Sequence, residues 1–333
     1  MPDRAQDVSG PPQESGASRG PRRLSAFRAH FREWTVAGAL AFLLLFLLGA
    51  APGFYQSQPL LSLLTRESPT LVVACGMALV MICRHVDISV GSLFSVCGVV
   101  AGLLWSSRWP APAVLLGAVT CGALGGAVNG ALVAGLRLPS IVVTLATMVA
   151  WREGLRWLRQ GQFVNLPDGA QWLGMSQWGG QTALIGLGLL VFLAILYVCA
   201  RIAGGRYIYA VGSDAEAARL TGIPASRVTF LTFVLLGTLT GFAAWMGALQ
   251  SPQVDPKAGA GLELKAIAAC VVGGVAVSGG RGNLWGVLVG LLLLVCVNPA
   301  LTHLRVEAHW EKAIQGSVIL LAVLADGWRS RRR

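Results

Sequence analysis

The sequence predicts an all-α protein, a polytopic bundle of transmembrane helices. Of its 333 residues, 55% are hydrophobic and only 12% are charged, which is about half the charged fraction of a typical soluble domain. The hydrophobic residues gather in runs close to the roughly 20 residues that a helix needs to cross a bilayer. Alternating segments of about 10 residues, the pattern of a membrane β-barrel, are not seen.

About ten apolar segments are candidates for these spans. They are residues 34–51, 69–83, 89–105, 111–135, 140–158, 182–200, 226–250, 264–280, 284–303 and 310–327. An even number of spans places both termini on one side of the membrane. With the termini in the cytoplasm, roughly 17 basic residues fall inside and about nine outside, as the positive-inside rule requires. We therefore expect cytoplasmic N- and C-termini.

The two ends of the chain differ in composition from the apolar domain at 34–327. Residues 1–33 are rich in Pro, Gly, Ser and Arg, which predicts a disordered cytoplasmic tail. Residues 328–333 form a second, basic cytoplasmic tail. A cleaved signal peptide is the alternative for the first apolar run, but Trp34–Ala51 is long enough to span, which favours an uncleaved helix.

Composition and motifs argue against several function classes. The net charge of +11 is spread over short loops and tails, so it follows membrane topology and gives no reason to expect a nucleic-acid partner. The seven cysteines lie within or at the edges of apolar runs without CxxC spacing, and the four histidines lack metal-ligand company. We expect no metal site. The sequence also contains no GxSxG, HExxH or GxxxxGK[ST] motif, so we expect neither catalysis nor bound ATP.

A polar stretch at 204–228 separates two long apolar runs. Ser213 is placed to cap a short helix, Asp214 to Thr221, with Glu216 as its capping-box partner. Gly222 suits the left-handed position that ends a helix, and Pro224 prevents continuation. Two interpretations remain open: an ordinary capped helix at the membrane surface, or a docking element for a second protein.

Ion-driven carriers usually keep an ionisable residue deep in the bilayer. We expect the acids here to avoid that depth. Asp87, Asp214, Glu216, Asp255, Glu307 and Asp326 fall in loops or at helix ends. Glu153 and Glu263 lie nearer the membrane edges beside basic residues. Without a coupling carboxylate or a nucleotide site, energy must come from a partner.

Uncharged polar residues near membrane depth are candidates for a translocation path. They are Asn129, Ser140, Thr144, Thr147 and Asn298. Their hydroxyls and amides suit a neutral polyhydroxy solute. The alternative for each is a hydrogen bond between helices.

Small residues recur at intervals of four, which lets helix backbones approach closely in lipid. Such rows occur at Gly122, Gly126 and Gly130, at Gly98 and Gly102, at Gly237 and Gly241, and at Gly286 and Gly290. They predict a compact bundle.

Three stretches carry a family likeness. They are Asp87-Ile-Ser-Val-Gly-Ser92, Glu216-Ala-Ala-Arg-Leu-Thr-Gly222, and the run from Gly259 to Gly274 that is followed by Gly279-Gly-Arg-Gly282. They resemble segments of bacterial ABC-type monosaccharide permeases of the ribose, rhamnose and autoinducer-2 group. The likeness covers about residues 60–327.

The resemblance implies an inner-membrane permease subunit of a sugar importer. Its partners would be a cytoplasmic ATPase carrying ATP and Mg, a periplasmic sugar-binding protein, membrane lipid, and a second permease subunit that is identical or homologous. The ATPase would dock on 213–222, through Ser213, Asp214, Glu216, Ala217, Arg219, Leu220 and Gly222. Structural roles in the signatures would fall to Asp87, Ser89, Gly91, Glu263, Gly273 and Gly274.

Rhamnose-like deoxysugars and autoinducer-2 are the leading solutes on this likeness. The alternatives are an ABC permease for another solute, such as a branched-chain amino acid or a nucleoside, and an ion-coupled secondary carrier. A zwitterionic solute would be expected to need fixed charges in or near its path.

Overall fold

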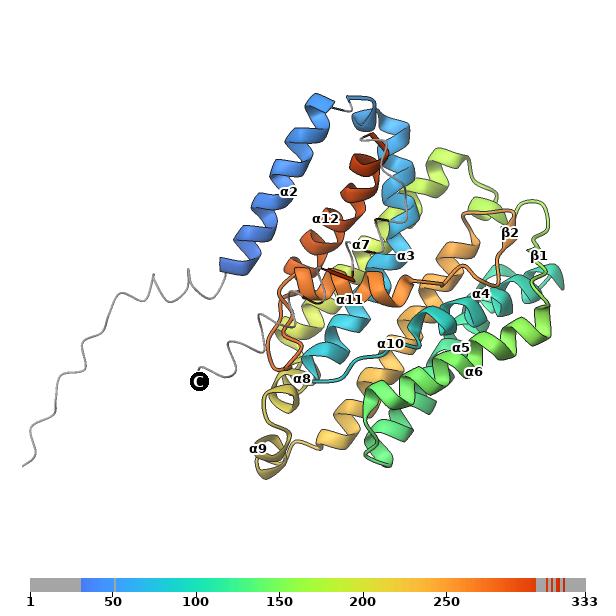
Figure 1. Ribbon diagram of the computed structural model, residues 1–333. Helices are drawn as coiled ribbons and strands as arrows, with labels where there is room; N and C mark the ends of the chain where they lie inside the picture. Colours follow the sequence, from blue (N-terminus) through green and yellow to red (C-terminus); the bar gives the residue numbers. More distant parts are fainter. Residues whose placement is uncertain are drawn as a thin grey trace, which may run out of the picture.

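The computed structural model describes residues 31–50 and 52–303, and five isolated positions beyond them (310, 313, 316, 317 and 320). The expected span at 310–327, the tail at 328–333 and most of the N-terminal tail lie outside this part of the chain. The described part is mainly helical (Figure 1). Its long helices are α2 (Phe31–Ala50), α3 (Ser57–Ile82), α4 (Val90–Ser106), α5 (Ala111–Gly130), α6 (Ser140–Arg159), α7 (Gln177–Arg201), α10 (Ala225–Ala248) and α12 (Leu284–His303).

Shorter elements connect and cap these helices. They are the 3₁₀ turns η1 (Pro52–Tyr55) and η3 (Gln171–Gly174), the π-helical turn η2 (Ala131–Gly135), and the helices α8 (Ala203–Ser213), α9 (Ala215–Leu220) and α11 (Leu262–Val272). The strands β1 (Val164–Asn165) and β2 (Gln253–Val254) pair antiparallel, with Val164 opposite Val254. The connection after α6 is thus tied to the connection after α10.

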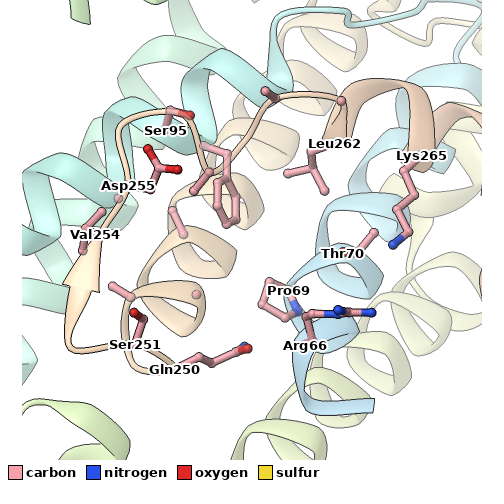
Figure 2. A pocket seen from close by; sticks show the side chains of 18 of the residues that line it. Arg66, Pro69, Thr70, Ser95, Gln250, Ser251, Val254, Asp255, Leu262 and Lys265 are labelled. Atoms are coloured by element: carbon pink, nitrogen blue, oxygen red, sulfur yellow. The ribbon is translucent and has the colours of Figure 1, made fainter. Parts of the chain in front are cut away.

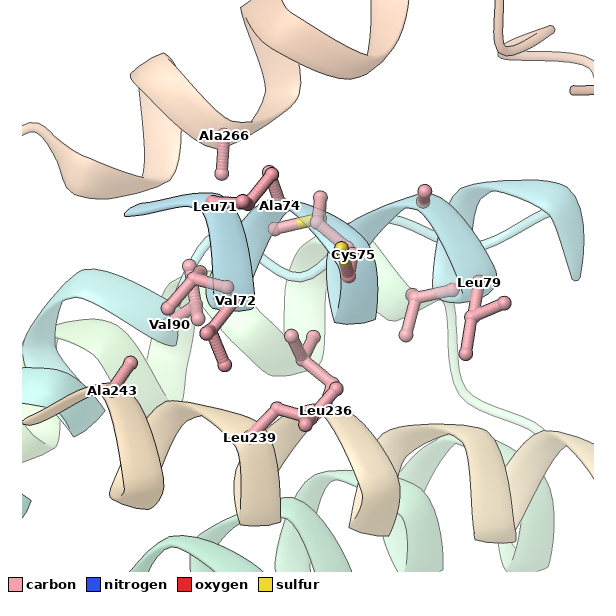
Figure 3. Close-up of a cluster of buried hydrophobic side chains, with 14 of the residues drawn as sticks. Leu71, Val72, Ala74, Cys75, Leu79, Val90, Leu236, Leu239, Ala243 and Ala266 are labelled. Atoms are coloured by element: carbon pink, nitrogen blue, oxygen red, sulfur yellow. The ribbon is translucent and has the colours of Figure 1, made fainter. Parts of the chain in front are cut away.

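Helix α3 forms the centre of the bundle. Every residue from 67 to 83 is buried, as expected for a helix that is apolar on all sides. Figure 3 shows it between α10 and α11, with Val72 and Leu79 facing Leu236 and Leu239, and Ala266 on the opposite side. A single buried cluster therefore joins the two halves of the chain.

Helices α5 and α10 make the most extensive helix–helix contact in the described part of the chain. At its centre, two glycine rows meet. A Cβ added at Gly122 would strike the carbonyl oxygen of Gly237, and one at Gly126 would strike that of Phe233. A Cβ at Gly241 would strike the carbonyl of Ala118. The close approach predicted from the glycine spacing is confirmed for this pair.

Two predicted spans have the wrong bounds. The segment predicted to begin at 69 belongs to α3, a 26-residue helix that already starts at Ser57. The segment predicted at 264–280 is not a continuous helix, because α11 has only 11 residues. At 1.5 Å per residue it is about 17 Å long, too short for a hydrocarbon core of about 30 Å. The diglycine Gly273-Gly274 ends it early.

Five helices in the described part are long and apolar enough to cross a membrane: α3, the combined α5–η2 segment, α7, α10 and α12. The apolar segments Val36–Ala50 and Val90–Ser106 are shorter. The chain is therefore a multi-pass membrane protein. The count of about ten spans and the cytoplasmic position of both termini stay predictions.

Pro69 lies inside α3, where it interrupts the helical hydrogen bonds. Proline has no N–H, so the carbonyl four residues earlier, that of Thr65, loses its usual donor. The side chain of Gln250, just after α10, donates its Nε2–H to this carbonyl at 3.1 Å. The bond ties α3 to the end of α10.

Substituting Gly126→Ala should destabilise the bundle, because the new methyl group meets backbone atoms of α10. Overpacking of this kind costs about 1–3 kcal/mol, and each kcal/mol lowers the Tm of a large domain by roughly 2–4 °C. Thermal unfolding in detergent measures this. Gly186→Ala in α7 is the matched control, since no atom lies within 4 Å of its added Cβ. Equal Tm values for the two variants would contradict the packing described.

The Pro69–Gln250 pair makes a second prediction. Gln250→Ala should lower the Tm of the natural chain, because it leaves the Thr65 carbonyl unpaired. In a Pro69→Ala background the restored N–H can bond that carbonyl, so the same substitution should cost less. A double-mutant cycle should give a coupling of about 0.5–1.5 kcal/mol, and a coupling of zero would rule out the bond.

Candidate functional site

A cavity of about 830 Å³ opens among α3, α4, α10, α11 and the connection that follows α10. Figure 2 shows polar side chains on two facing walls: Ser95 and Asp255 on one, Arg66 and Lys265 on the other. Gln250 and Ser251 close a third side. The cavity is therefore polar on several sides, within a bundle whose core is apolar.

The charged groups of this cavity balance one another. Three cationic side chains line it, those of Arg66, Arg152 and Lys265, and three carboxylates face them. The carboxylates belong to Glu67, Asp255 and Glu263. The formal charges sum to zero, so the cavity as a whole attracts neither anions nor cations strongly.

Three ion pairs organise these charges, and in the longest of them Arg66 Nε lies 3.7 Å from Glu67 Oε1. Lys265 Nζ lies 2.7 Å from Glu67 Oε1, and Arg152 Nη2 lies 3.5 Å from Glu263 Oε1. Both glutamates are more than nine-tenths buried. Their second oxygens, Oε2, are buried and have no hydrogen-bond partner among the described residues. A buried carboxylate oxygen without a donor is costly, so each glutamate has an unused capacity to accept a hydrogen bond.

Two of the family-like stretches, Asp87–Ser92 and Gly259–Gly274, interlock beside this cavity. A Cβ at Gly91, in the first stretch, would strike Oε2 of Glu263 and the carbonyl oxygen of Gly259, both in the second. The hydroxyl of Ser95 accepts the Gly259 N–H at 3.0 Å. Gly91 is thus a residue whose missing side chain lets the Glu263 carboxylate lie against α4.

Glu67 is a buried acid inside a helix that is long and apolar enough to cross a membrane. It is residue 11 of the 26-residue helix α3 and is buried. The sequence does not predict this position, because Pro69 is a residue type that often opens helices. The polar run Thr65-Arg66-Glu67-Ser68 before it then looked like a loop. Its partner Lys265 lies 198 positions away, and no local pattern could have paired them.

A second polar cluster lies where α4 begins. Asp87 is buried and accepts hydrogen bonds from the backbone N–H of Ser89 at 2.8 Å and from its hydroxyl. The Nδ2 group of Asn129, on α5, donates to Asp87 Oδ2 at 3.2 Å and Ser89 Oγ at 2.8 Å. Thr147, on α6, donates to Asn129 Oδ1 at 2.9 Å. Both amide atoms of Asn129 are thus engaged within the protein.

The remaining path candidates have local partners. Thr144 donates to the carbonyl of Ser140 one turn earlier, and the Ser140 hydroxyl accepts the N–H of Val86 at 3.4 Å. The side chain of Asn298, in α12, lies outside the described part. Four of the five candidates are therefore brought together near the start of α4. Their hydrogen bonds join α5, α6 and the 83–89 connection, and their role in translocation stays a prediction.

The stretch predicted to dock a partner folds as two helices. Residues 203–213 form α8, so Ser213 ends that helix and does not cap the next one. The N-cap of α9 is Asp214, whose carboxylate accepts the N–H groups of Glu216 at 2.9 Å and Ala217 at 3.0 Å. The capping box predicted for Ser213 and Glu216 is wrong, because Asp214 satisfies the same donors.

The end of α9 at Gly222, predicted from the sequence, is confirmed. Gly222 adopts φ +85°, and the N–H of Ile223 bonds the carbonyl of Ala218 at 3.0 Å. On the exposed side, Arg219 forms a two-point pair with Glu216, at 2.6 and 3.2 Å. The hydrogen bonds and charge of Arg219 hold the pKa of Glu216 below its usual range.

The surface of α9 combines one apolar side chain with this charged pair. Leu220 is 79% exposed, whereas Ala218 is buried and faces the bundle. Leu220 and the Arg219–Glu216 pair are thus exposed side chains that α9 offers to a partner. Ala218 belongs to the buried core and anchors the helix.

The C-terminal end of α3 and the 273–283 connection hold α8, the helix that precedes α9, in place. A Cβ at Gly212 would strike the carbonyl oxygen of Ile82, the last residue of α3. The same carbonyl accepts the N–H of Gly280 at 2.8 Å. The signature residue Gly274 ends α11 with φ +88°, and its neighbour Gly273 meets the backbone of Gly286 in α12. These contacts place α8 and α9 at the end of α3 away from the cavity.

In the described part of the chain, no group of three His, Cys, Asp or Glu side chains is arranged to hold a metal ion. The site thus offers hydrogen bonds and paired charges. Such a set suits binding and passage of a polar solute.

Comparison with known proteins points the same way. A family model described as branched-chain amino acid transport system / permease component matches residues 60–323. The autoinducer 2 import system permease protein LsrC of Enterobacter sp. (strain 638) is 36% identical over 292 residues, 86% of this chain and 85% of that protein.

The proteins of the same name from Klebsiella pneumoniae and Photorhabdus luminescens are similar to a comparable extent. The Klebsiella pneumoniae protein is 35% identical over 297 residues, which cover 89% of this chain and 86% of that protein. The Photorhabdus luminescens protein is 32% identical over 295 residues, which cover 88% of this chain and 89% of that protein. No solved structure matches this chain. The resemblance seen in the sequence is confirmed, and the chain belongs to the permease-component family of branched-chain amino acid transport systems, as a membrane transport subunit and not an enzyme.

Proposed function

We propose that this chain is the permease subunit of an ATP-driven importer for a small sugar-like solute, with autoinducer-2 as the first candidate. The relatives named for autoinducer-2 import are similar over nearly all of their length. The membrane would be the bacterial inner membrane. The partners would be a cytoplasmic ATPase that carries ATP and Mg, a periplasmic binding protein, and a second permease subunit, identical or homologous.

One observation carries this proposal: α10 begins beside α9 and ends at the cavity. The turn at 221–224 joins α9 directly to Ala225, and Ala244, Gly247 and Ala248 at the other end line the cavity. At 1.5 Å per residue the 24-residue helix is about 36 Å long. A push on α9 by a closing ATPase would therefore tilt α10 and reshape the cavity, which is the action that alternating access requires.

The predicted topology gives this arrangement a direction. With the termini inside, α9 faces the cytoplasm and the cavity faces the periplasm, where a binding protein would deliver its solute. The exposed apolar side chains of α6 and α7, such as Val142, Leu145 and Leu190, fit membrane lipid. Basic residues near α9 follow the positive-inside rule.

A second solute class is favoured by one observation. The family model is described by branched-chain amino acid transport, and the cavity has the fixed charges that a zwitterion would need. The charges are, however, already paired with one another at Lys265–Glu67 and Arg152–Glu263. The third class, an ion-coupled carrier, is not what the names of the relatives describe.

Docking through α9 is tested with Leu220→Asp. The side chain is 79% exposed, so the change should leave insertion and Tm unaltered. Loss of a hot-spot residue costs about 2 kcal/mol or more, so if Leu220 is the hot spot of the contact, co-purification of the ATPase and ATP-driven uptake should fall by about tenfold or more. Leu136→Ala, an exposed leucine 65% accessible at the same end of the bundle, is the control and should behave as the natural chain. Normal ATPase association in Leu220→Asp would exclude α9 as the contact.

Solute class and energy source are tested together in proteoliposomes that hold the permease, the ATPase and the binding protein. We expect ATP-dependent uptake of labelled autoinducer-2, with D-ribose and L-rhamnose as comparators, and none of L-leucine. Vesicles with the permease alone should accumulate nothing. Uptake of L-leucine in preference to the sugars would support the second class, and accumulation by the lone chain would refute the ATP-driven mechanism.

A further inference from the structure

We infer that the 830 Å³ cavity is the solute-binding site, and that Glu67 and Glu263 accept hydrogen bonds from hydroxyl groups of a neutral solute there. This inference rests on the proposed function and assigns it a site and a class of contact. Neither glutamate stood among the path candidates read from the sequence, which were all uncharged.

In the described part of the chain, Oε2 of each glutamate lacks a donor, although both residues line the cavity. The last torsion of a glutamate side chain is soft, so a small rotation presents Oε2 to the cavity without moving α3 or α11. A hydroxyl that donates there satisfies an atom which the protein leaves unsatisfied.

The balanced charges of the cavity lining favour a neutral solute. The three cations and three carboxylates of the lining sum to zero, so a net charge on the solute would meet no compensating field. A zwitterion would have to displace Lys265 from Glu67 or Arg152 from Glu263. A hydroxyl both donates and accepts, and it can join these pairs without breaking them.

The rest of the wall suits a hydroxylated molecule. Arg66, Arg152 and Lys265 supply donors beyond those used in the pairs, and Asp255 faces Arg66 and Lys265 across the cavity (Figure 2). Phe94 and Pro69 add apolar surface for the carbon face of a sugar ring. The volume falls within the roughly 300–1,000 Å³ of common small-molecule sites.

The test is equilibrium dialysis of labelled autoinducer-2 against the purified permease–ATPase complex, without the binding protein. Glu67→Gln and Glu263→Gln keep the side-chain shape and replace one acceptor oxygen by a donor. Each should raise the Kd by about tenfold, because a charge-assisted hydrogen bond to the solute is lost. Glu153→Gln is the matched control, because Glu153 is also paired with an arginine, Arg156 at 3.0 Å, but is exposed and lies outside the cavity lining.

A role of Glu67 in stability alone is separated by exchanging the charges. Glu67→Lys combined with Lys265→Glu should restore the ion pair and the Tm, but not the Kd, because the carboxylate now sits on α11. Recovery of the Kd in this double variant would overturn the binding role. So would an unchanged Kd in both single variants, a wild-type complex without measurable binding, or displacement by L-leucine as effective as by D-ribose.

The outcome can be told apart from failure of the proposed function. If the complete natural system imports autoinducer-2 but the glutamate variants bind it normally, only the site is wrong. If the complete natural system imports no sugar-like solute, the proposed function itself fails.

Discussion

Backbone contact between α5 and α10 is the constraint on which the arrangement of the bundle depends. Lipid tails are as apolar as leucine, so helices in a membrane gain little from burying apolar side chains and rely on close packing instead. Here the glycines of one helix touch the carbonyls of the other, at Gly122 against Gly237 and at Gly126 against Phe233. That contact fixes where α10 runs, and its two ends then define the docking element and the cavity.

The central helix α3 contacts both the segment that carries α8 and α9 and the cavity. Its last carbonyl, that of Ile82, accepts the Gly280 N–H and lies against Gly212, which supports α8 and α9. Its earlier turns carry Arg66 and Glu67 into the cavity. Since residues 67–83 are all buried, the helix has no free surface along which it could move independently. A displacement at one end is therefore expected to reach the other through packed helices.

The sequence predicted features that depend on local chemistry. The glycine rows, the Gly222 turn and the family-like stretches were recognisable because neighbouring residues define them. Ser213 was misjudged as a cap since Asp214, one position later, offers a stronger acceptor to the same N–H groups. The Glu67–Lys265 pair, the contact of Gly91 with Glu263 and the extra turns of α3 depend on residues far apart in the chain. Spacing alone carries no information about them.

The hydrogen bond from Gln250 to Thr65 bears on how the mouth of the cavity could change shape. A regular helix loses backbone hydrogen bonds when one of its turns unwinds. In α3, Pro69 already removes one of these bonds, and the side chain of Gln250, just after α10, bonds the carbonyl that is left. Breaking the Gln250–Thr65 hydrogen bond costs about 0.5–1.5 kcal/mol and breaks no backbone hydrogen bond of α3. Pro69 thus makes one carbonyl of α3 depend on Gln250 for its hydrogen bond. This bond can break and re-form while the helix keeps its conformation.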